Sequence, residues 1–325
     1  MNFFTATAIA HPNIAFIKYW GNQDDILHIP LNGSLSMNLA ALTTTTSVEF
    51  RTDLRQDDVV IDGRSASPAA LQRVSAFLDL IRIYMPEKNV KAIVISQNNF
   101  PMGAGIASSA SAFAALAAAA SRAAGLELEE TALSRLARHG SGSACRSIPD
   151  GFVEWLPGRD DEDSYAVSIA APTHWQLVDL IAVVNRAHKE VGSSAGHALA
   201  KTSPLQTARV ADCPHRLAIC RNAVLKKDFT AFAQVVELDS NLMHAVMQTS
   251  TPPLLYWEPT TVEIMKSVRA WRADGLQVCY TIDAGPNVHV ICLQNDSARL
   301  ESLLQQIAGV ESIYHSTAGS GVQLV

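Results

Sequence analysis

Residues 101–111 read PMGAGIASSAS, and an alanine-rich run suited to a helix follows them directly. Gly103 and Gly105 allow the backbone to turn tightly and to approach a ligand closely. The first N–H groups of the following helix would lie at the positive end of its dipole, where anions bind. Ser108 and Ser109 add hydroxyl donors that could also reach a magnesium ion. The pattern indicates a cradle for the phosphates of a nucleotide triphosphate.

The same residues are also typical of a plain helix start, because serine and glycine favour helix N-termini. The P-loop signature GxxxxGK[ST] and the protein-kinase signatures are absent from the chain. A nucleotide site here would therefore belong to another class of enzyme. The choice between a helix cap and a phosphate site depends on the rest of the sequence.

Length and composition indicate a globular protein. The chain has 325 residues, a length that favours two domains. Of these residues 48% are hydrophobic and 17% are charged, which excludes extensive disorder. The net charge of -6 comes from 31 acidic and 25 basic residues, and like charges do not cluster into a nucleic-acid-binding arm. We therefore expect small-molecule partners and no nucleic acid.

The start of the chain and the cysteines bear on the cell compartment. The apolar residues 3–10 lack a basic flank and are interrupted by His11 and Pro12, so they do not resemble a secretory signal. Residues 104–120 are too rich in alanine and serine to span a membrane. The five cysteines are scattered and odd in number, which favours reduced thiols. We expect a cytoplasmic protein with no membrane partner.

Hydrophobic periodicity places strands mainly in the first half and helices mainly in the second. Strands are predicted at Ile14–Lys18, Ser34–Leu39, Thr45–Phe50, Ala92–Ser96, Gly151–Leu156, Leu177–Val184, Cys279–Asp283 and Val288–Leu293. Helices are predicted from Ser67-Pro68 to Pro86, in the alanine-rich run, and at Glu129–Arg138, Leu205–Lys226, Phe229–Met247, Thr260–Ala273 and Ala298–Ala308. This mixture indicates an α+β fold. We predict two domains, residues 1–180 and 181–325.

Three further blocks carry polar residues beside turns. Residues 13–21, NIAFIKYWG, place Lys18 at the end of a strand; residues 139–147, HGSGSACRS, expose backbone donors and Arg146; residues 281–287, TIDAGPN, end a strand at Asp283. Taken singly, they fit a snorkelling lysine, a surface arginine and a hairpin turn. Together with the glycine-serine loop they supply a phosphate cradle, two cations and a carboxylate base.

With these blocks the chain resembles the mevalonate diphosphate decarboxylases of the GHMP kinase superfamily. Matching blocks follow one another in the right order at residues 13–21, 30–39, 98–115, 133–155, 184–205, 239–256 and 283–287. The resemblance implies an N-terminal ribosomal S5 domain 2-like domain that binds ATP and a C-terminal ferredoxin-like α/β sandwich domain. It also implies ATP and Mg²⁺ as cofactors and a homodimer, without assigning the magnesium ligands.

The resemblance implies a reaction in which ATP phosphorylates the 3-hydroxyl of a 5-phosphorylated mevalonate, after which phosphate and carbon dioxide leave to give an alkene. Asp283 would accept or orient the hydroxyl proton, while Lys18 keeps that carboxylate ionised. Arg146 would hold the substrate carboxylate. The remaining implied contacts are to the substrate for Asn13, Tyr19, Ser141, Ser143 and His197, and to ATP for Gly103, Gly105, Ser108 and Ser109.

Two departures from the family pattern concern the number of substrate phosphates. The family usually has lysine where this chain has Asn22, and methionine where it has His197. Losing a cation near the distal phosphate would weaken diphosphate binding by about 1–2 kcal/mol. We therefore expect 5-phosphomevalonate as the substrate, with 5-diphosphomevalonate as the alternative. His188, Lys189 or His197 could restore the missing charge.

Two other functions are compatible with this fold. A small-molecule kinase of the superfamily would stop after phosphorylation, and a non-catalytic sensor would bind nucleotide without turnover. The presence of both Lys18 and Asp283 favours the complete decarboxylation over the kinase. A sensor should have lost at least one catalytic residue, whereas Arg146 and the serines are also present.

Overall fold

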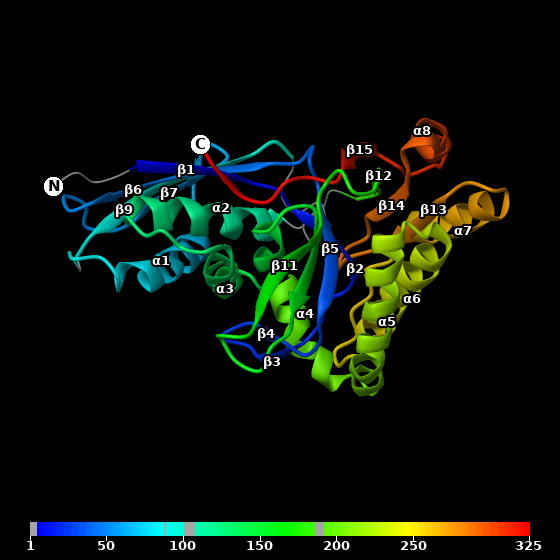
Figure 1. Cartoon of the computed structure of the whole chain (residues 1–325), viewed down its shortest axis with the longest axis horizontal. Helices are drawn as coiled ribbons and strands as arrows, with labels where there is room; N and C mark the ends of the chain where they lie inside the picture. The colour runs from blue at the N-terminus through cyan, green and yellow to red at the C-terminus, as the bar shows by residue number, and fades with distance from the viewer. Residues whose placement is uncertain (1–4, 88, 101–107, 186–191) are drawn as a thin grey trace.

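The computed structural model describes residues 5–87, 89–100, 108–185 and 192–325, and these form an α+β fold with three main sheets (Figure 1). Gly103 and Gly105 of the predicted phosphate cradle and residues 188 and 189 lie outside the described residues. The three sheets are stabilised by helices that cover their faces, as the sequence pattern predicts.

The first sheet has six strands in the order β16-β1-β6-β9-β7-β8. Its members are β1 (Thr5–Ala10), β6 (Thr44–Arg51), β7 (Asp58–Ile61), β8 (Arg64–Ser65), β9 (Lys91–Asn98) and β16 (Gln323–Leu324). Helices α1 (Pro68–Arg82) and α2 (Ser108–Ala123) pack on it in a shared hydrophobic core. Ser67 caps α1 by accepting a hydrogen bond from the N–H of Ala70, which confirms the predicted helix start.

The second sheet has the order β11-β10-β5-β2, so β2 is an edge strand. Its strands are β2 (Asn13–Ile17), β5 (Ser34–Asn38), β10 (Phe152–Leu156) and β11 (Tyr165–Ala170). A short hairpin, β3 (Asn22–Asp24) and β4 (Ile29–Pro30), lies between β2 and β5 in the sequence. Helix α3 (Glu130–Gly140) and the 3-10 helix Gly142–Ser147 lead from α2 into β10.

The third sheet has the order β13-β14-β12-β15, which makes β13 a second edge strand. Its strands are β12 (Leu177–Val183), β13 (Val278–Thr281), β14 (Val288–Leu293) and β15 (Ser312–Thr317). Helices α7 (Pro259–Ala273) and α8 (Ser297–Gln305) cover one face, and α5 (Gln206–Lys226) and α6 (Phe229–Gln248) cover the other. Short helix α4 (Ser193–Leu199) precedes α5. Every residue of β12 is buried because both faces are covered.

The second and third sheets share one hydrophobic core, which α5 and α6 fill from between them (Figure 1). Phe232 of α6 is fully buried there. Its ring lies 4.8 Å from that of Phe16 on β2 and 5.2 Å from that of Trp175, which precedes β12. The relative position of the two sheets is therefore fixed by packing rather than by a flexible linker.

The sequence pattern did not reveal β1, which lies inside the first sheet, or the strands β3, β4, β7, β8, β11, β15 and β16, which are short or lie at sheet edges. Strand β16, at the C-terminal end, pairs antiparallel with β1 and thus returns the chain to the first sheet. The proposed division at residues 180 and 181 falls within β12 and stays a prediction. Among the described residues no helix is both long and apolar enough to cross a bilayer. All five cysteines are free and buried.

Replacing Phe232 with alanine should destabilise the protein by about 3–5 kcal/mol, because it leaves a cavity in the core that joins two sheets. Urea denaturation followed by tryptophan fluorescence and by circular dichroism should show a single transition at lower urea. Phe232→Leu, which leaves a smaller cavity, should cost less. Two separate transitions in the wild type would contradict a shared core.

Candidate active site

Lys18 and Asp283 are in direct contact although they are far apart in the sequence. Lys18 directly follows edge strand β2, and Asp283 lies two residues after edge strand β13. The Lys18 Nζ atom lies 2.6 Å from Asp283 Oδ1. The Lys18 side chain is 1% exposed and that of Asp283 is 26% exposed, so the pair has one buried and one accessible member. A carboxylate that is accessible and oriented by a buried cation is suited to act as a base.

Burial lowers the pKa of Lys18, and the neighbouring Asp283 carboxylate opposes this shift. The backbone of Lys18 is also fixed by side chains. Its N–H donates to Asp239 at 2.6 Å, and its carbonyl accepts from Arg209 at 2.8 Å and from Asn32 at 3.0 Å. The position of the lysine therefore does not depend on the ion pair alone.

Arg146 is a buried cation whose hydrogen-bond partners among the described residues are neutral. Its Nε and one terminal nitrogen donate to Asn13 Oδ1 at 3.2 and 3.0 Å, and the other terminal nitrogen donates to Ser34 Oγ at 2.7 Å. Asn13 is held in turn by Ser147 Oγ at 2.8 Å. Burial lowers the pKa of Arg146, with Asp283 opposing. Such a site favours an anionic ligand, because an uncompensated buried charge is costly.

His197 stacks against the rings of Tyr19 and Trp20, the two residues that directly follow Lys18. The His197 ring lies 4.1 Å from that of Tyr19 and 4.6 Å from that of Trp20. The Gly21 N–H donates to His197 Nδ1 at 2.9 Å, so that nitrogen carries no proton. Burial lowers the pKa of His197 from 6.5 to about 3. The suggestion that His197 replaces the missing positive charge is therefore wrong, because its imidazole is neutral near pH 7.

Asn22 is held in place by two neighbours. Its Oδ1 accepts a hydrogen bond from the Tyr19 hydroxyl, and its Nδ2 donates to Asp25 Oδ1 at 2.9 Å. The corner formed by Asn22, His197 and Asp25 thus combines a neutral amide, a neutral imidazole and a carboxylate. It offers no positive charge from these three side chains to a distal phosphate.

The start of α2 meets the loop after α3. Ser109 Oγ lies 3.2 Å from Ser141 Oγ, which joins the predicted nucleotide-binding serines to the predicted substrate-binding loop. Ser143 contributes through its backbone, because its carbonyl accepts from Asn13 Nδ2 at 3.2 Å. A side chain at Gly142 would collide with the Tyr19 hydroxyl, which lies 2.6 Å from the position that a Cβ atom would take. The lack of a side chain at Gly142 therefore allows this loop to lie against Tyr19, which follows β2.

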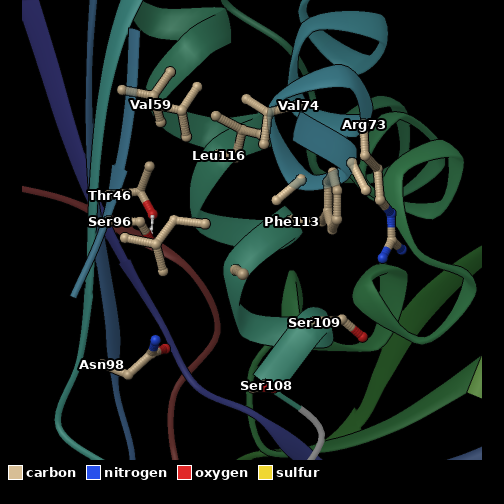
Figure 2. A pocket seen from close by; sticks show the side chains of 15 residues that line it. Thr46, Val59, Arg73, Val74, Ser96, Asn98, Ser108, Ser109, Phe113 and Leu116 are labelled. Carbon is tan, nitrogen blue, oxygen red and sulfur yellow. Dashed lines mark hydrogen bonds between the residues drawn. The ribbon is translucent and has the colours of Figure 1, made fainter. Parts of the chain in front are cut away.

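A cavity of about 360 Å³ lies next to Ser108 and Ser109, between α1, α2 and the first sheet (Figure 2). Most of its lining is apolar and comes from residues such as Val59, Leu116 and Phe113. Arg73 lies 4.6 Å above the Phe113 ring and closes one side. A flat apolar group attached to phosphates would fit here, with its phosphates at the start of α2.

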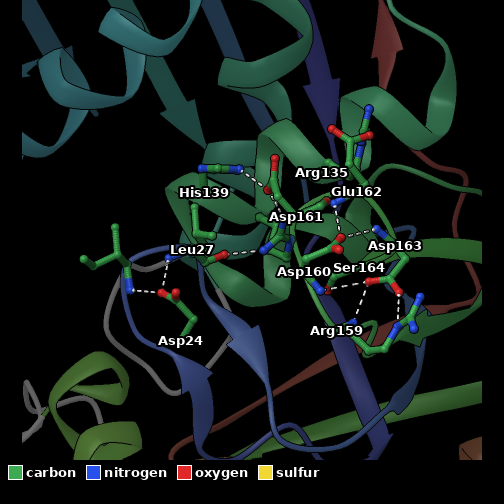
Figure 3. A network of polar contacts seen from close by, with 12 residues as sticks. Asp24, Leu27, Arg135, His139, Arg159, Asp160, Asp161, Glu162, Asp163 and Ser164 are labelled. Carbon is green, nitrogen blue, oxygen red and sulfur yellow. Dashed lines mark hydrogen bonds and ion pairs between the residues drawn. The ribbon is translucent and has the colours of Figure 1, made fainter.

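A network of polar contacts at the end of α3 holds the loop that begins at Ser141 (Figure 3). Arg138, in the last turn of α3, is fully buried and donates to the Leu27 carbonyl and to Asp161. His139 Nε2 lies 2.7 Å from Asp161 Oδ1. The network ties the end of α3, just before Ser141, to the turn that follows β3. It therefore fixes the loop relative to the Asn22 corner.

Most of the predicted site residues lie together, but the residues that hold them were not identified from the sequence. Ser34, Ser147, Asp239 and His244 fall inside the blocks that match the family, yet none has a neighbouring pattern that indicates its role. Within the described residues, no group of three or more histidine, cysteine, aspartate or glutamate side chains could hold a metal ion. Each supporting residue contacts its partner only through the tertiary fold, because the two are distant in the sequence.

Comparison with known protein families matches almost the whole chain. Residues 10–166 match the diphosphomevalonate decarboxylase-like N-terminal domain, and residues 179–323 match the mevalonate 5-diphosphate decarboxylase C-terminal domain. The diphosphomevalonate decarboxylase of Candida albicans is 34% identical, with 98% of each chain covered. That of Homo sapiens is 38% identical over 90% of this chain and 78% of the human protein.

Solved structures show the same fold. Mevalonate diphosphate decarboxylase from Staphylococcus aureus superposes with a TM-score of 0.93 at 37% identity, covering 99% of this chain and 98% of that one. The Enterococcus faecalis enzyme gives a TM-score of 0.92 at 36% identity with the same coverage. A third structure, with a TM-score of 0.93 and 36% identity, is described as MDDEF in complex with MVAPP, AMPPCP and magnesium.

Stability should fall as the pH drops below about 6.5, because the unfolded chain then protonates His197 while the folded protein keeps it neutral down to about 3. Free energies of unfolding in urea at about pH 7.5 and about pH 5 should show this loss. His197→Met should lose less stability between the two values, since one such group is gone. An identical loss in wild type and variant would contradict a neutral, buried His197.

Proposed function

Because the chain belongs to the diphosphomevalonate decarboxylase family, we propose that it is an ATP-dependent carboxy-lyase acting on a 5-phosphorylated mevalonate. The observation that carries this proposal is the 2.6 Å contact between Lys18 and Asp283, next to the buried Arg146. A base, a buried cation and an anion site at one place suit the phosphorylation of a hydroxyl group on a carboxylic acid.

In the first step Asp283 accepts or orients the proton of the substrate's 3-hydroxyl, whose oxygen then attacks the terminal phosphorus of ATP and releases ADP. A tertiary alcohol is a weak nucleophile, so the position of the base matters. Lys18 stabilises the negative charge that develops as the hydroxyl loses its proton. Arg146 holds the substrate carboxylate, which fixes the hydroxyl against Asp283.

In the second step the C–O bond to the new phosphate breaks, and the electron pair leaves with inorganic phosphate. The bond between the neighbouring carbon and the carboxylate then supplies two electrons to the electron-poor carbon, forming the C=C bond and releasing carbon dioxide. Phosphorylation thus creates a leaving group. Arg146 and Lys18 favour this step because they hold the departing groups within a buried, positively charged environment.

The start of α2 and the neighbouring cavity would hold ATP. The apolar cavity walls suit the adenine ring, and Ser108, Ser109 and the helix N-terminus suit the phosphates. Magnesium neutralises charge on the phosphates when it is bound. Its ligands would be phosphate oxygens and a serine hydroxyl of this pair, because both serines lie at the start of α2, where the phosphates would bind. The complex with AMPPCP and magnesium in a similar structure supports these two cofactors.

The comparisons favour 5-diphosphomevalonate as the substrate. The matching relatives carry the name diphosphomevalonate decarboxylase, and a similar structure contains MVAPP. The preference for 5-phosphomevalonate that Asn22 suggested is not supported by them. We therefore take the diphosphate as the first candidate and treat the monophosphate as the second.

One observation keeps the monophosphate in consideration. The corner formed by Asn22, Asp25 and His197 lacks a positive charge, and Asp25 carries a negative one. A second phosphate placed there would gain no charge-assisted hydrogen bond from these residues.

The assignments of a cytoplasmic location, a homodimer and a domain boundary at residue 180 remain predictions.

Replacing Asp283 with asparagine should lower the rate of carbon dioxide release by roughly 10²–10⁴-fold, because the base is lost. Binding of the ATP analogue AMPPCP should change little, since the nucleotide lies at the start of α2. Stopped assays that count ADP and carbon dioxide would measure this. Near-normal turnover in Asp283→Asn would remove Asp283 from the mechanism, and ADP without carbon dioxide in the wild type would indicate a kinase.

The wild type should release carbon dioxide from 5-diphosphomevalonate with ATP, and not from unphosphorylated mevalonate. Asn22→Lys should raise kcat/KM for the diphosphate relative to 5-phosphomevalonate by roughly 5–30-fold, which corresponds to about 1–2 kcal/mol. Asn22→Gln, which adds length without charge, is the matched control. A wild type that prefers the monophosphate would reverse the order of the two candidates, and no release from any substrate would exclude the proposed function.

A further inference from the structure

Helix α6 lies against the edges of two different sheets, and each of these edges leads to one member of the Lys18–Asp283 pair. Strand β2 is the edge of the second sheet, and strand β13 is the edge of the third. Edge strands leave every second backbone N–H and C=O group without a partner in the sheet. Side chains of α6 bond one backbone group directly after β2 and three backbone groups in and directly after β13.

On the β2 side, Asp239 is the residue that contacts the edge. It is fully buried, and its Oδ2 accepts the Lys18 N–H at 2.6 Å. Its other oxygen, Oδ1, accepts from Arg216 Nε at 2.8 Å. The carboxylate is therefore held by a cation on α5 while it fixes the backbone of the lysine. A buried charge is tolerated here because both of its oxygens are bonded.

On the β13 side, two residues of α6 bond alternate backbone N–H groups. Glu237 Oε1 accepts from the Tyr280 N–H at 3.3 Å, and Ser240 Oγ accepts from the Ile282 N–H at 3.0 Å. Arg272 holds Glu237 with both terminal nitrogens, one at 2.5 Å and one at 2.8 Å. The period of two shows that α6 replaces a missing neighbouring strand as far as Ile282, the residue before Asp283.

His244 completes the contact one turn further along α6. It is fully buried, and its Nε2 lies 3.3 Å from the Ile282 carbonyl oxygen, so that nitrogen must carry the proton and donate it. Burial lowers the pKa of His244 to about 4, so the imidazole is neutral. Ser240 and His244 thus hold both the N–H and the C=O of Ile282.

We propose that Asp239, Ser240 and His244 are positioning residues that set the Lys18–Asp283 distance from a single helix. Because they lie on one rigid element, a shift of either sheet relative to the other is resisted at the backbone of both reacting side chains. This inference rests on the proposed function for the catalytic meaning of the pair, although the geometry itself does not. None of the three needs to contact the substrate.

The test compares His244→Leu, which removes the donor, with His244→Gln, whose Nε2 can replace it. His244→Leu should lower kcat on the order of 10–100-fold, as misplacement of a catalytic group does, while KM for ATP changes less than about threefold. His244→Gln should recover most of kcat. Ser240→Ala, a smaller change that leaves the helix intact, should also lower kcat with little effect on KM.

Val235→Ala is the control for lost stability, because Val235 is a buried core residue of the same helix that makes none of these bonds. It should unfold at lower urea than the wild type and keep its kcat. Equal losses of kcat in Val235→Ala and His244→Leu would overturn the inference. So would a glutamine variant as slow as the leucine variant.

Crystal structures of the variants provide a readout that does not need activity. In His244→Leu or Ser240→Ala, the Lys18 Nζ to Asp283 Oδ1 separation should exceed hydrogen-bond range, about 3.5 Å. A separation that stays at 2.6 Å in both variants would overturn the inference. An inactive wild type with a lengthened separation in the variants would instead contradict the proposed function alone.

Discussion

The contact between Lys18 and Asp283 is the constraint on which the rest of the structure depends. It joins residues at the ends of two edge strands in different sheets, and the lysine is 1% exposed. Removing an ammonium group from water is costly unless its partner is held close to it. The two sheets must therefore keep a fixed relative position, which the core around Phe232 and the polar face of α6 provide.

The same constraint explains the charges of the site. Lys18 and Arg146 bring two buried cations near one partly exposed carboxylate, although the whole chain has a net charge of -6. An anionic substrate is thus attracted locally by the site against the overall charge of the protein. The corner at Asn22, Asp25 and His197, whose three side chains carry no positive charge, limits how far that positive region extends.

The sequence predicted the fold class and the main strands and helices, because hydrophobic periodicity and turn residues are local signals. Lys18, Arg146 and Asp283 were assigned to one site by the resemblance to the family, because each of the three also fits a purely structural role when taken alone. The sequence did not predict the supporting residues. Asp239 and His244 are two of several polar residues of α6, and only the position of two distant strand edges gives them a role. The neutral state of His197 likewise depends on its burial and on the Gly21 N–H, which the local sequence does not reveal. The two-residue strand β16 has no local signal either.

The most direct test of the catalytic role of this contact is a crystal structure of the protein with 5-diphosphomevalonate and AMPPCP. We predict that the 3-hydroxyl oxygen lies within hydrogen-bond distance of an Asp283 carboxylate oxygen, about 2.6–3.2 Å. We also predict that the substrate carboxylate contacts the Arg146 guanidinium and that Lys18 stays bonded to Asp283. A substrate bound with its 3-hydroxyl away from Asp283, or with its carboxylate away from Arg146, would contradict that role.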